Sequence, residues 1–544
     1  MPNFDPSLCS FLQGKQTFTA GKIALLGSRG AGMTALSEVL ADRNHCLVGF
    51  DQAVPLPSHT AASHTAASHT AASQTATSQT AASQRTLLPI RNAGQTALNS
   101  KPRLTHPWEW NPTLAEDTRV CICSPAIRDD DPFRQRFIEA GVPIIRLHQA
   151  VDAVFQDSHQ ICVTGTHGKS TTTAMLAWIM ETAGRDPGYF IGAKFQHSGR
   201  SGQSSKRLSV FCENNHRHQQ TAVIESCEFN RSFHQLSPST IVLTGLERDH
   251  FDCFRHQQDE DTAFFELLQK LPENGFVIYN SNCQRSVALV RQINRRSIAC
   301  AMQSQDVQQS YRQQTQCDLL RNADFQVTDF QQLSSGIQFR IHFQAESQWA
   351  NLPVFGQHNA SNAANAIATA VCHGVSLFDS VQALASFPGI ERRFQHRGSV
   401  AGMELIDDYA HHPTAIRTTL QAARKKYPKR QIRVCFEPHQ LIRLEQLQAE
   451  FVDALSLADT VYVLPVLAAR ESASMAKCHQ NSHKLIIRLR SCGTSAFFSP
   501  DLDHVVQTVD YSANPNAVLL TMGAGSTHLI HDKLIDRLRR DSVA

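Results

Sequence analysis

The segment GTHGKS, Gly165–Ser170, constrains the fold of this chain more than any other feature. Residues 161–164 before it are predicted to form a strand, and a helix is predicted to follow, beginning with Ser170 and three threonines. Glycines let backbone N–H groups converge on phosphate oxygens, a lysine reaches the β and γ phosphates, and a hydroxyl binds Mg²⁺. The segment therefore predicts a nucleotide-phosphate site in an α/β domain, although its glycines are closer together than in G-x-x-x-x-G-K-[ST]. A chance glycine turn before a helix is the alternative.

Acidic residues follow two strand-like runs beyond this loop. Glu225 and Glu228 end the run TAVIESCE, and Glu247, Asp249 and His250 end the run TIVLTGLERDH. In doubly wound sheets, ligands bind at the carboxyl ends of the strands. Because Mg²⁺ prefers oxygen ligands, we expect one or two of these acids to hold it, and the alternative for each is a solvated turn residue.

A second glycine-rich turn lies near the N-terminus. Lys22–Leu26 is predicted to be a strand, Gly27–Gly32 a turn, Met33–Leu40 the start of a helix, and CLVGFD a strand ending at Asp51. This spacing is typical of a dinucleotide-type βαβ unit. Arg29 occupies the place of the usual second glycine, so the pattern alone is weak evidence for a nucleotide site.

A pentapeptide repeat runs from Ser58 to Gln84, with SHTAA three times and then SQTAT and SQTAA. A period of five fits neither a helix nor a strand, and these residues offer almost nothing to bury. We therefore predict a disordered insert at residues 56–115 within the first domain. Histidines recur in the repeat, but without carboxylates or thiols nearby a metal site is the less favoured interpretation.

Composition excludes several classes of protein. The 51 Lys and Arg residues nearly balance the 48 Asp and Glu, which argues against nucleic-acid or membrane binding as the main function. There is no apolar run of about 18 residues, as a membrane-spanning helix needs, and the N-terminus lacks a secretion-signal pattern. The 15 cysteines are odd in number and scattered, which favours reduced thiols in a cytoplasmic enzyme.

The length of 544 residues allows three to four domains at about 150 residues each. Strand-like runs alternate with helical patterns again after Phe387. We predict an α/β fold with three domains. They are a Rossmann-like N-terminal domain at 1–157, a central P-loop ATPase-like domain at 158–386, and a Rossmann-like C-terminal domain at 387–544.

Many ordered motifs run through all three predicted domains: GSRGAGM, SPAI, GTHGKSTTTAM, ESCEFNRSFHQLSP, LERDHFD, FGQHNASNAANA, PGIERRF, DDYAHHPTAI, FEPHQLIR, AARES and TMGAG. Together they resemble the Mur ligases, the ATP-dependent amino-acid-adding enzymes of peptidoglycan synthesis. The resemblance implies ligation of L-alanine to UDP-N-acetylmuramate, with ATP and Mg²⁺ as cofactors. The muramoyl carboxylate would attack the γ-phosphate of ATP, and the amine of L-alanine would then attack the resulting acyl phosphate.

The resemblance also implies roles for individual residues. It places ATP at Gly165, Thr166, His167, Gly168, Lys169, Ser170, Thr171, Asn359 and Asn362, with the two asparagines at adenine. It assigns catalysis to Lys169, His250, Arg393, Asp408, His411 and Arg443. It assigns one Mg²⁺ to Ser170 and Glu225, and a second metal to His250. It places the uridine-diphosphate part at Gly27, Gly30, Gly32, Asp51 and Ser124. The alternative for the asparagines is that they cap a helix starting near Ala360.

Several positions depart from the family pattern. Cys227 and Asn230 stand where E-A-D-E-x-D has acids, Gln440 stands where an arginine is common, Pro125 replaces a serine, and Arg29 replaces a glycine. Since Glu225 and Glu228 remain, we expect metal binding to persist.

Three other functions stay open. A sister ligase that recycles murein tripeptide shares the phosphate loop, although FEPHQLIR and TMGAG favour the L-alanine enzyme. The second is a non-catalytic protein that binds a sugar nucleotide. The third is a redox enzyme, which only the first glycine turn suggests.

Overall fold

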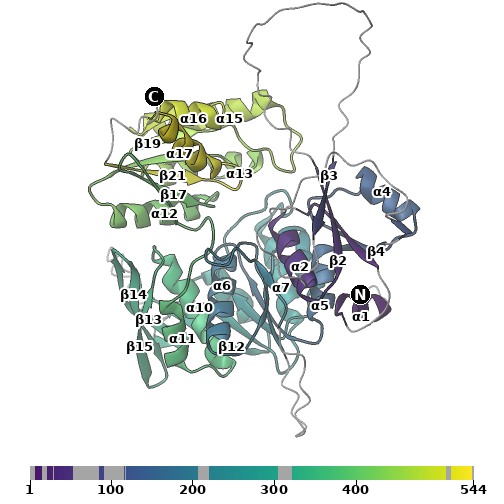
Figure 1. Cartoon of the computed structure of the whole chain (residues 1–544). Coiled ribbons are helices and arrows are strands. Elements are labelled where there is room, and N and C mark those ends of the chain that lie inside the picture. Colours follow the sequence, from purple (N-terminus) through teal and green to yellow (C-terminus); the bar gives the residue numbers. More distant parts are fainter. Residues whose placement is uncertain are drawn as a thin grey trace, which may run out of the picture. The chain divides into compact units, whose positions relative to one another are not determined.

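The computed structural model describes residues 6–14, 21–28, 30–52, 85–90, 115–116, 118–205, 220–303, 321–509 and 516–541. The chain divides into two compact units, Met1–Ala150 and Val151–Ala544, and each is described by itself. Within these residues the strands form three sheets, one in the first unit and two in the second (Figure 1).

The first unit holds a five-stranded sheet in the order β3-β2-β1-β4-β5. Its strands are β1 (Lys22–Leu26), β2 (Cys46–Gln52), β3 (Arg85–Ile90), β4 (Thr118–Cys123) and β5 (Ile144–Arg146). Its helices are α1 (Pro6–Leu12), α2 (Ala31–Asp42) and α4 (Pro132–Glu139), and α5 (Leu147–Phe155) spans the boundary between the units. All neighbouring strands are parallel except β2 and β3. The predicted strand–turn–helix–strand order at the N-terminus is therefore confirmed.

The predicted disordered insert at 56–115 is wrong in one part. The repeat from Ser58 to Gln84 lies outside the described residues, but Arg85–Ile90 forms strand β3, antiparallel to β2. RTLLPI is apolar and β-prone, unlike the repeat before it, and Pro89 is tolerated because β3 is at the edge of the sheet. The insert was predicted too long because the low-complexity repeat dominated the composition of the whole stretch.

The second unit begins with a ten-stranded sheet in the order β15-β14-β13-β12-β11-β10-β6-β9-β7-β8. Neighbours from β13 through β6 to β7 are parallel, and the end strands β14, β15 and β8 are antiparallel to theirs. The strands are β6 (His159–Thr164), β7 (Gly188–Phe190), β8 (Gly202–Gln203), β9 (Thr221–Glu225), β10 (Thr240–Leu243), β11 (Phe276–Asn280), β12 (Arg296–Met302), β13 (Phe325–Leu333), β14 (Gly336–Phe343) and β15 (Glu346–Leu352).

Helices α6 (Lys169–Thr182), α10 (His358–Cys372) and α11 (Leu377–Ala385) share one core with this sheet (Figure 1). The other helices of this part are η1 (Phe229–Gln235), α7 (Gln257–Gln269) and α8 (Gln284–Val290). Buried residues of α10 are mostly alanines, which let the helix approach α6 closely. This close packing brings the first turn of α10 to the start of α6, where the GTHGKS loop lies.

The third sheet has the order β16-β17-β21-β18-β19-β20, and only β16 is antiparallel to its neighbour. Its strands are β16 (Gln395–Val400), β17 (Met403–Asp408), β18 (Gln431–Phe436), β19 (Thr460–Val463), β20 (Ser495–Phe498) and β21 (Ala517–Met522). Its helices are α12 (Pro413–Lys426), α13 (Leu441–Gln446), α14 (Gln448–Leu455), α15 (Met475–Ser491), α16 (Leu502–Thr508) and α17 (Leu529–Asp541). Each of the three predicted domains thus contains one sheet, and the α/β class is confirmed.

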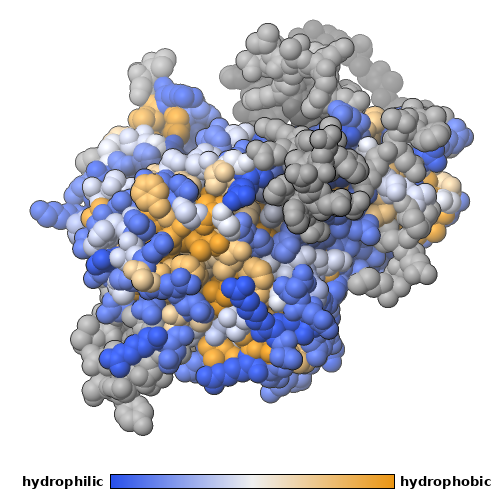
Figure 2. Space-filling view, turned by 90° about the horizontal axis from the view of Figure 1, so that it is seen from below, coloured by the Kyte–Doolittle hydropathy of each residue, from blue (hydrophilic) through white to orange (hydrophobic). Residues whose placement is uncertain are grey.

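Exposed apolar residues do not mark the predicted site. Figure 2 shows one face of the molecule, on which polar residues surround a central apolar area. Among the described residues, the large exposed apolar side chains include Trp349 on β15 and Phe378 on α11, and none is a predicted site residue. Within the described ranges, no helix combines the length and the apolar character that crossing a bilayer requires, and the cysteines are free thiols.

Candidate active site

The GTHGKS loop joins β6 to α6 and depends on its glycines. Gly165 has φ +125° and Gly168, the residue before α6, has φ +81°. A Cβ on Gly165 would lie 2.4 Å from Thr244 Oγ1, and one on Gly168 would lie 2.2 Å from Asn362 Oδ1. Both positions therefore require glycine, for conformation and for space. The chance-turn alternative does not explain a loop packed on both sides at the carboxyl end of a central strand.

Lys169 is held inside this loop. Its Nζ donates to the carbonyl oxygens of Gly165 (2.5 Å) and Thr166 (3.1 Å) and to Glu228 Oε1 (3.0 Å). Its side chain is 12 % exposed and that of Glu228 is 0 % exposed. Burial by itself lowers the pKa of Lys169, but the Glu228 carboxylate outweighs it and raises this pKa, so the ammonium stays charged. The lysine is therefore a fixed cation at the mouth of the loop.

Ser170 and Glu225 form the first predicted metal position. Ser170 Oγ donates to Glu225 Oε1 at 2.8 Å, and the Gly192 N–H donates to Glu225 Oε2 at 2.5 Å. A Cβ on Gly192 would lie 3.0 Å from that carboxylate, so a glycine keeps the space open. A hydroxyl and a carboxylate are ligands that fit Mg²⁺ together with water. The donor set therefore suits the cation that the sequence predicted.

His250, predicted at a second metal position, lies beside Glu228. Its Nε2 lies 3.3 Å from Glu228 Oε1, and ligand atoms of Cys227, Glu228 and His250 all lie within 4.8 Å of one another. His250 has a positive φ of +52°. Ser170 and Glu225 thus form one group and His250 with Glu228 another. Sequence spacing does not distinguish the two glutamates, because both follow the same strand.

Asn359 and Asn362 lie in the first two turns of α10, against the phosphate loop. Asn359 Nδ2 donates to the Phe355 carbonyl at 2.8 Å, and Asn362 Nδ2 donates to Asn359 Oδ1 at 3.1 Å. The residue before the helix is Gln357, and neither asparagine caps it. The capping alternative is therefore wrong. The two amides form a buried polar pair beside Gly168.

Glu247 connects the phosphate loop with the third sheet. Its Oε2 accepts from Thr414 Oγ1 at 2.6 Å and lies 3.1 Å from His167 Nε2 and 3.6 Å from His412 Nδ1. Burial opposes ionisation, but the hydrogen bond from His167 prevails and lowers the pKa of Glu247 to about 2. Sequence analysis missed His412 and Thr414, although both lie in the quoted motif DDYAHHPTAI.

Arg443 on α13 forms a buried ion pair with Asp249, which follows β10. Its Nε and Nη2 lie 2.8 and 2.7 Å from Asp249 Oδ1, and its Nη1 lies 3.0 Å from His439 Nδ1. The side chains of Arg443 and Asp249 are 1 % and 6 % exposed. Arg443 therefore ties the third sheet to the nucleotide-loop sheet rather than facing an open cavity.

Asp408, at the end of β17, holds the loop that contains Arg393. It accepts backbone N–H groups of Phe394 and Ala410, both at 2.8 Å. Burial raises the pKa of Asp408, and Arg393 opposes this shift. The Arg393 guanidinium lies 5.5 Å from the Tyr409 ring centroid, and within the described part of the chain it forms no ion pair. Its donors are therefore free to meet an anion.

His411 is buried beside these residues. Its Nδ1 lies 2.9 Å from the Tyr409 carbonyl oxygen, so a protonated Nδ1 donates there, and its ring packs at 5.7 Å on that of His439. Burial, together with Arg443, holds the pKa of His411 well below its usual value. A neutral imidazole leaves Nε2 as an acceptor.

In the first unit, Gly27, Gly30 and Ser124 meet at the carboxyl ends of β1 and β4. Gly27 has φ +77°, and a Cβ there would lie 2.8 Å from Ser124 Cβ. Gly30 is the residue before α2, Gly32 lies in its first turn, and Asp51 lies in β2. The three glycines and Ser124 therefore lie at the N-terminus of α2, which favours anions. Arg29, the departure in this loop, lies outside the described residues.

Gln440 and Asn230, the other two departures beside the site, both have positive φ, at +70° and +52°. Gln440 is fully buried, and its Nε2 donates to Asp252 Oδ2 at 3.0 Å. Arg470 also donates to Asp252, at 3.1 Å. Asp252 therefore has a cationic partner in Arg470, and the neutral amide of Gln440 is sufficient at position 440.

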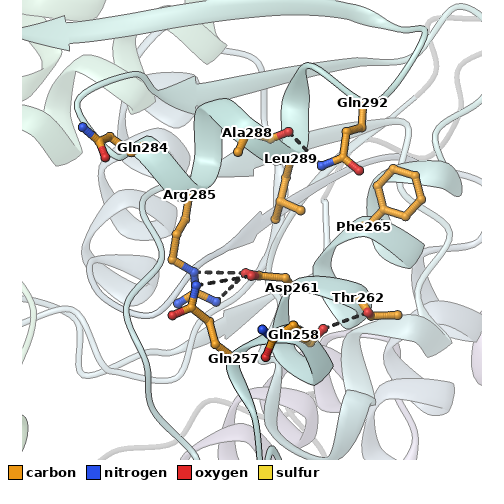
Figure 3. A pocket seen from close by; sticks show the side chains of 10 residues that line it. All are labelled: Gln257, Gln258, Asp261, Thr262, Phe265, Gln284, Arg285, Ala288, Leu289 and Gln292. Atoms are coloured by element: carbon orange, nitrogen blue, oxygen red, sulfur yellow. Dashed lines mark hydrogen bonds and ion pairs between the residues drawn. The ribbon is translucent and has the colours of Figure 1, made fainter.

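A separate pocket of about 460 Å³ lies between α7 and α8 (Figure 3). Its polar lining includes Gln257, Gln258, Gln284 and Gln292. Arg285 faces Asp261 there, with Nη2 at 2.5 Å from Oδ1, and also lies 2.9 Å from Glu260. None of the predicted site residues lines this pocket.

Glu260, which forms an ion pair with Arg285, has a raised carboxyl pKa. Burial raises the pKa of its carboxyl from 4.5 to about 7, although Arg285 opposes the shift. Its contribution to stability is therefore fully present below about pH 4.5 and is lost as pH rises through 7. We expect Glu260→Gln to remove roughly 1–3 kcal/mol of this pH-dependent change in the free energy of unfolding. Urea unfolding at pH 5 and pH 8 measures it, with the exposed Glu266→Gln on the same helix as control. An unchanged pH dependence in Glu260→Gln would refute the assignment.

Comparison with known proteins shows the family to which this chain belongs. Residues 163–370 match the Mur ligase middle domain, and residues 392–525 match the glutamate ligase domain of Mur ligases. With a phosphate loop, two acidic groups and a third sheet joined to them, the chain belongs to the Mur ligase family and is a ligase.

The relatives of this chain include proteins named UDP-N-acetylmuramate–L-alanine ligase. That of Solibacter usitatus is 31% identical over 78% of this chain and 83% of its own length. That of Roseiflexus sp. is 27% identical over 95% of this chain and 99% of its own length.

Solved structures support the fold. A UDP-N-acetylmuramate-alanine ligase from Thermotoga maritima has TM-score 0.62 at 24% identity, covering 78% of this chain and 86% of that one. A murein peptide ligase from Psychrobacter arcticus has TM-score 0.65 at 23% identity, covering 95% and 98%.

Proposed function

We propose that this chain uses ATP to join L-alanine to UDP-N-acetylmuramate, in the cytoplasmic synthesis of peptidoglycan precursors. The observation that carries the proposal is the buried Lys169 ammonium beside two carboxylate groups, Glu225 with Ser170 and Glu228 with His250. The names of the curated relatives support the choice of substrates. UDP-N-acetylmuramate would use the glycine turn before α2, where N–H groups favour a diphosphate.

The first step transfers the γ-phosphoryl group of ATP to the muramoyl carboxylate and releases ADP. Lys169 would leave its loop carbonyls and bind the transferring phosphoryl group, and the N–H groups at the start of α6 would bind the other phosphates. Ser170 and Glu225 would hold Mg²⁺, which neutralises phosphate charge when bound. Arg393 supplies a further cation from the third sheet.

In the second step, the α-amine of L-alanine attacks the acyl carbon, and inorganic phosphate leaves from a tetrahedral intermediate. The amine must lose a proton to water, and the neutral His411 imidazole offers an acceptor nitrogen that would orient an amine N–H. Asp408 fixes the loops on both sides of Tyr409 and so positions Arg393 and His411. Arg443, through its ion pair with Asp249, holds this sheet against the nucleotide loop and helps to exclude water.

ADP release with different acceptors tests the proposed substrates. With UDP-N-acetylmuramate present, we expect the highest kcat/KM with L-alanine, lower values with L-serine and glycine, and none with a murein tripeptide. A preference for the tripeptide would replace this proposal with a recycling ligase. No ADP release with any acceptor would favour a protein that only binds the sugar nucleotide.

Replacing either asparagine of α10 tests the adenine assignment. Asn359→Ala or Asn362→Ala should raise the KM for ATP by roughly 5- to 150-fold, because an unpaired adenine edge costs about 1–3 kcal/mol. The KM for L-alanine should change little. Asn365→Ala is a matched control, since Asn365 is buried on the same helix but its amide has no hydrogen-bond partner in the described part of the chain. If only the KM for L-alanine rises, the two asparagines belong to another subsite.

A further inference from the structure

The cluster formed by Cys227, Glu228 and His250 contains a donor that Mg²⁺ does not favour. Cys227 and Glu228 follow β9, His250 lies in the segment after β10, and Glu228 contacts Lys169. The set combines a sulfur, a carboxylate oxygen and an imidazole nitrogen. Mg²⁺ prefers six oxygen ligands, whereas thiolate and imidazole together suit Zn²⁺, Co²⁺ and similar ions. The chain has therefore replaced a hard ligand position by a soft one at this place.

The cluster has the dimensions of a tetrahedral site. Usual bond lengths to Zn²⁺ put neighbouring ligand atoms about 3.3–3.6 Å apart. His250 Nε2 lies 3.3 Å from Glu228 Oε1, and the complete set lies within 4.8 Å, so small side-chain rotations close it. Three protein ligands leave a fourth position open, as in catalytic zinc sites.

Two buried polar atoms in the cluster lack hydrogen bonds. Among the described residues, Glu228 Oε2 and His250 Nδ1 have no hydrogen-bond partner, and the Glu228 side chain is fully buried. Glu228 does form an ion pair with Lys169, but the lysine also donates to two carbonyl oxygens of its own loop. Lys169 therefore already neutralises the charge of Glu228, and a bound cation would use the remaining acceptor positions of this carboxylate beside the unpartnered His250 ring.

We propose that Cys227, Glu228 and His250 bind a divalent cation of the zinc and cobalt class, and that the Cys227 sulfur makes this position select such a cation over Mg²⁺. Ser170 and Glu225, which offer only oxygen, keep the position suited to Mg²⁺. The inference deepens the proposed function and rests on it for the role of the site, since the nucleotide phosphates would meet both cations.

Titration of the full-length, metal-free protein with Co²⁺ alone tests the inference. We expect a near-ultraviolet thiolate-to-cobalt charge-transfer band that saturates at one equivalent and that Zn²⁺ abolishes. Cys227→Ser should lose the band, and Cys253→Ser, which removes a neighbouring half-buried thiol outside the cluster, should keep it. Histidines elsewhere can bind cobalt but do not give a thiolate band. Absence of the band in the unmodified protein, or its persistence in Cys227→Ser, would overturn the proposal.

Affinity measurements give a second, independent result. Competition with a chromophoric chelator should show Cys227→Ser weakening Zn²⁺ binding by roughly 10-fold or more, as even loss of an outer partner of a ligand does. Cys227→Asp should weaken Zn²⁺ binding and strengthen Mg²⁺ binding. Equal Zn²⁺ affinities in all three proteins would refute the role of the sulfur. Neither measurement uses nucleotide or amino acid, so a negative result here leaves the ligation proposal intact, and a failed ligation assay leaves the metal result intact.

Discussion

Lys169→Ala is expected to lower kcat for ligation by roughly 10³-fold or more, the scale of losing a preorganised electrostatic group. The ammonium is almost fully enclosed by the phosphate loop and Glu228, so bulk water does not screen it. Removing it leaves the transferring phosphoryl charge without its nearest fixed cation. It also leaves Glu228 buried without the Lys169 ion pair. The variant should therefore lose stability of the folded protein as well as stabilisation of the transition state.

Coupled ADP release measures the effect, together with a melting curve that shows whether the variant folds. Lys425→Ala is the control, because Lys425 is an exposed lysine on α12 away from the loop. We expect the control to keep unmodified kinetics. Near-normal ligation by Lys169→Ala would remove the phosphate loop from the proposed mechanism.

Asp249→Ala should destabilise the second unit by about 3–5 kcal/mol, because it leaves the Arg443 guanidinium buried without its carboxylate. Both side chains are nearly inaccessible, and two guanidinium nitrogens lie within 2.8 Å of Asp249 Oδ1. Burial by itself raises the pKa of Asp249, but Arg443 overrides it and holds this pKa well below its usual value. The pair therefore stabilises the fold above the usual carboxyl pKa, and this contribution is lost as pH falls.

Urea unfolding at neutral pH measures this loss. The matched control is Asp453→Ala, which breaks the exposed pair with Arg417 and should cost less than about 1 kcal/mol. The double variant Asp249→Ala with Arg443→Met should recover part of the stability, because no uncompensated charge remains buried. Equal losses in Asp249→Ala and Asp453→Ala would show that the buried pair does not hold the two sheets together.

The sequence by itself determined the elements around the site. Strand β6, the glycine loop and α6 follow from local patterns, because an apolar run, two glycines and good helix formers act over a few residues. Strand β1, the following turn and α2 also follow from local patterns. The α/β class with three sheets could be predicted as well, because the alternation of strand and helix patterns is visible without knowledge of distant contacts. Composition was a less accurate guide than these local patterns, because it predicted that the insert included the residues of β3. The pairing of β3 with β2 depends on residues more than thirty positions away.

Only the tertiary structure decided which side chains meet. Ser170 contacts Glu225 and Lys169 contacts Glu228, although both glutamates end the same segment more than fifty residues from the loop. Asn362 packs on Gly168, and Arg443 is buried on Asp249 across 194 positions of sequence. Such contacts are set by sheet order and helix packing. A one-residue change in where a strand ends turns a different side chain toward the loop, because neighbouring residues of a strand point to opposite faces.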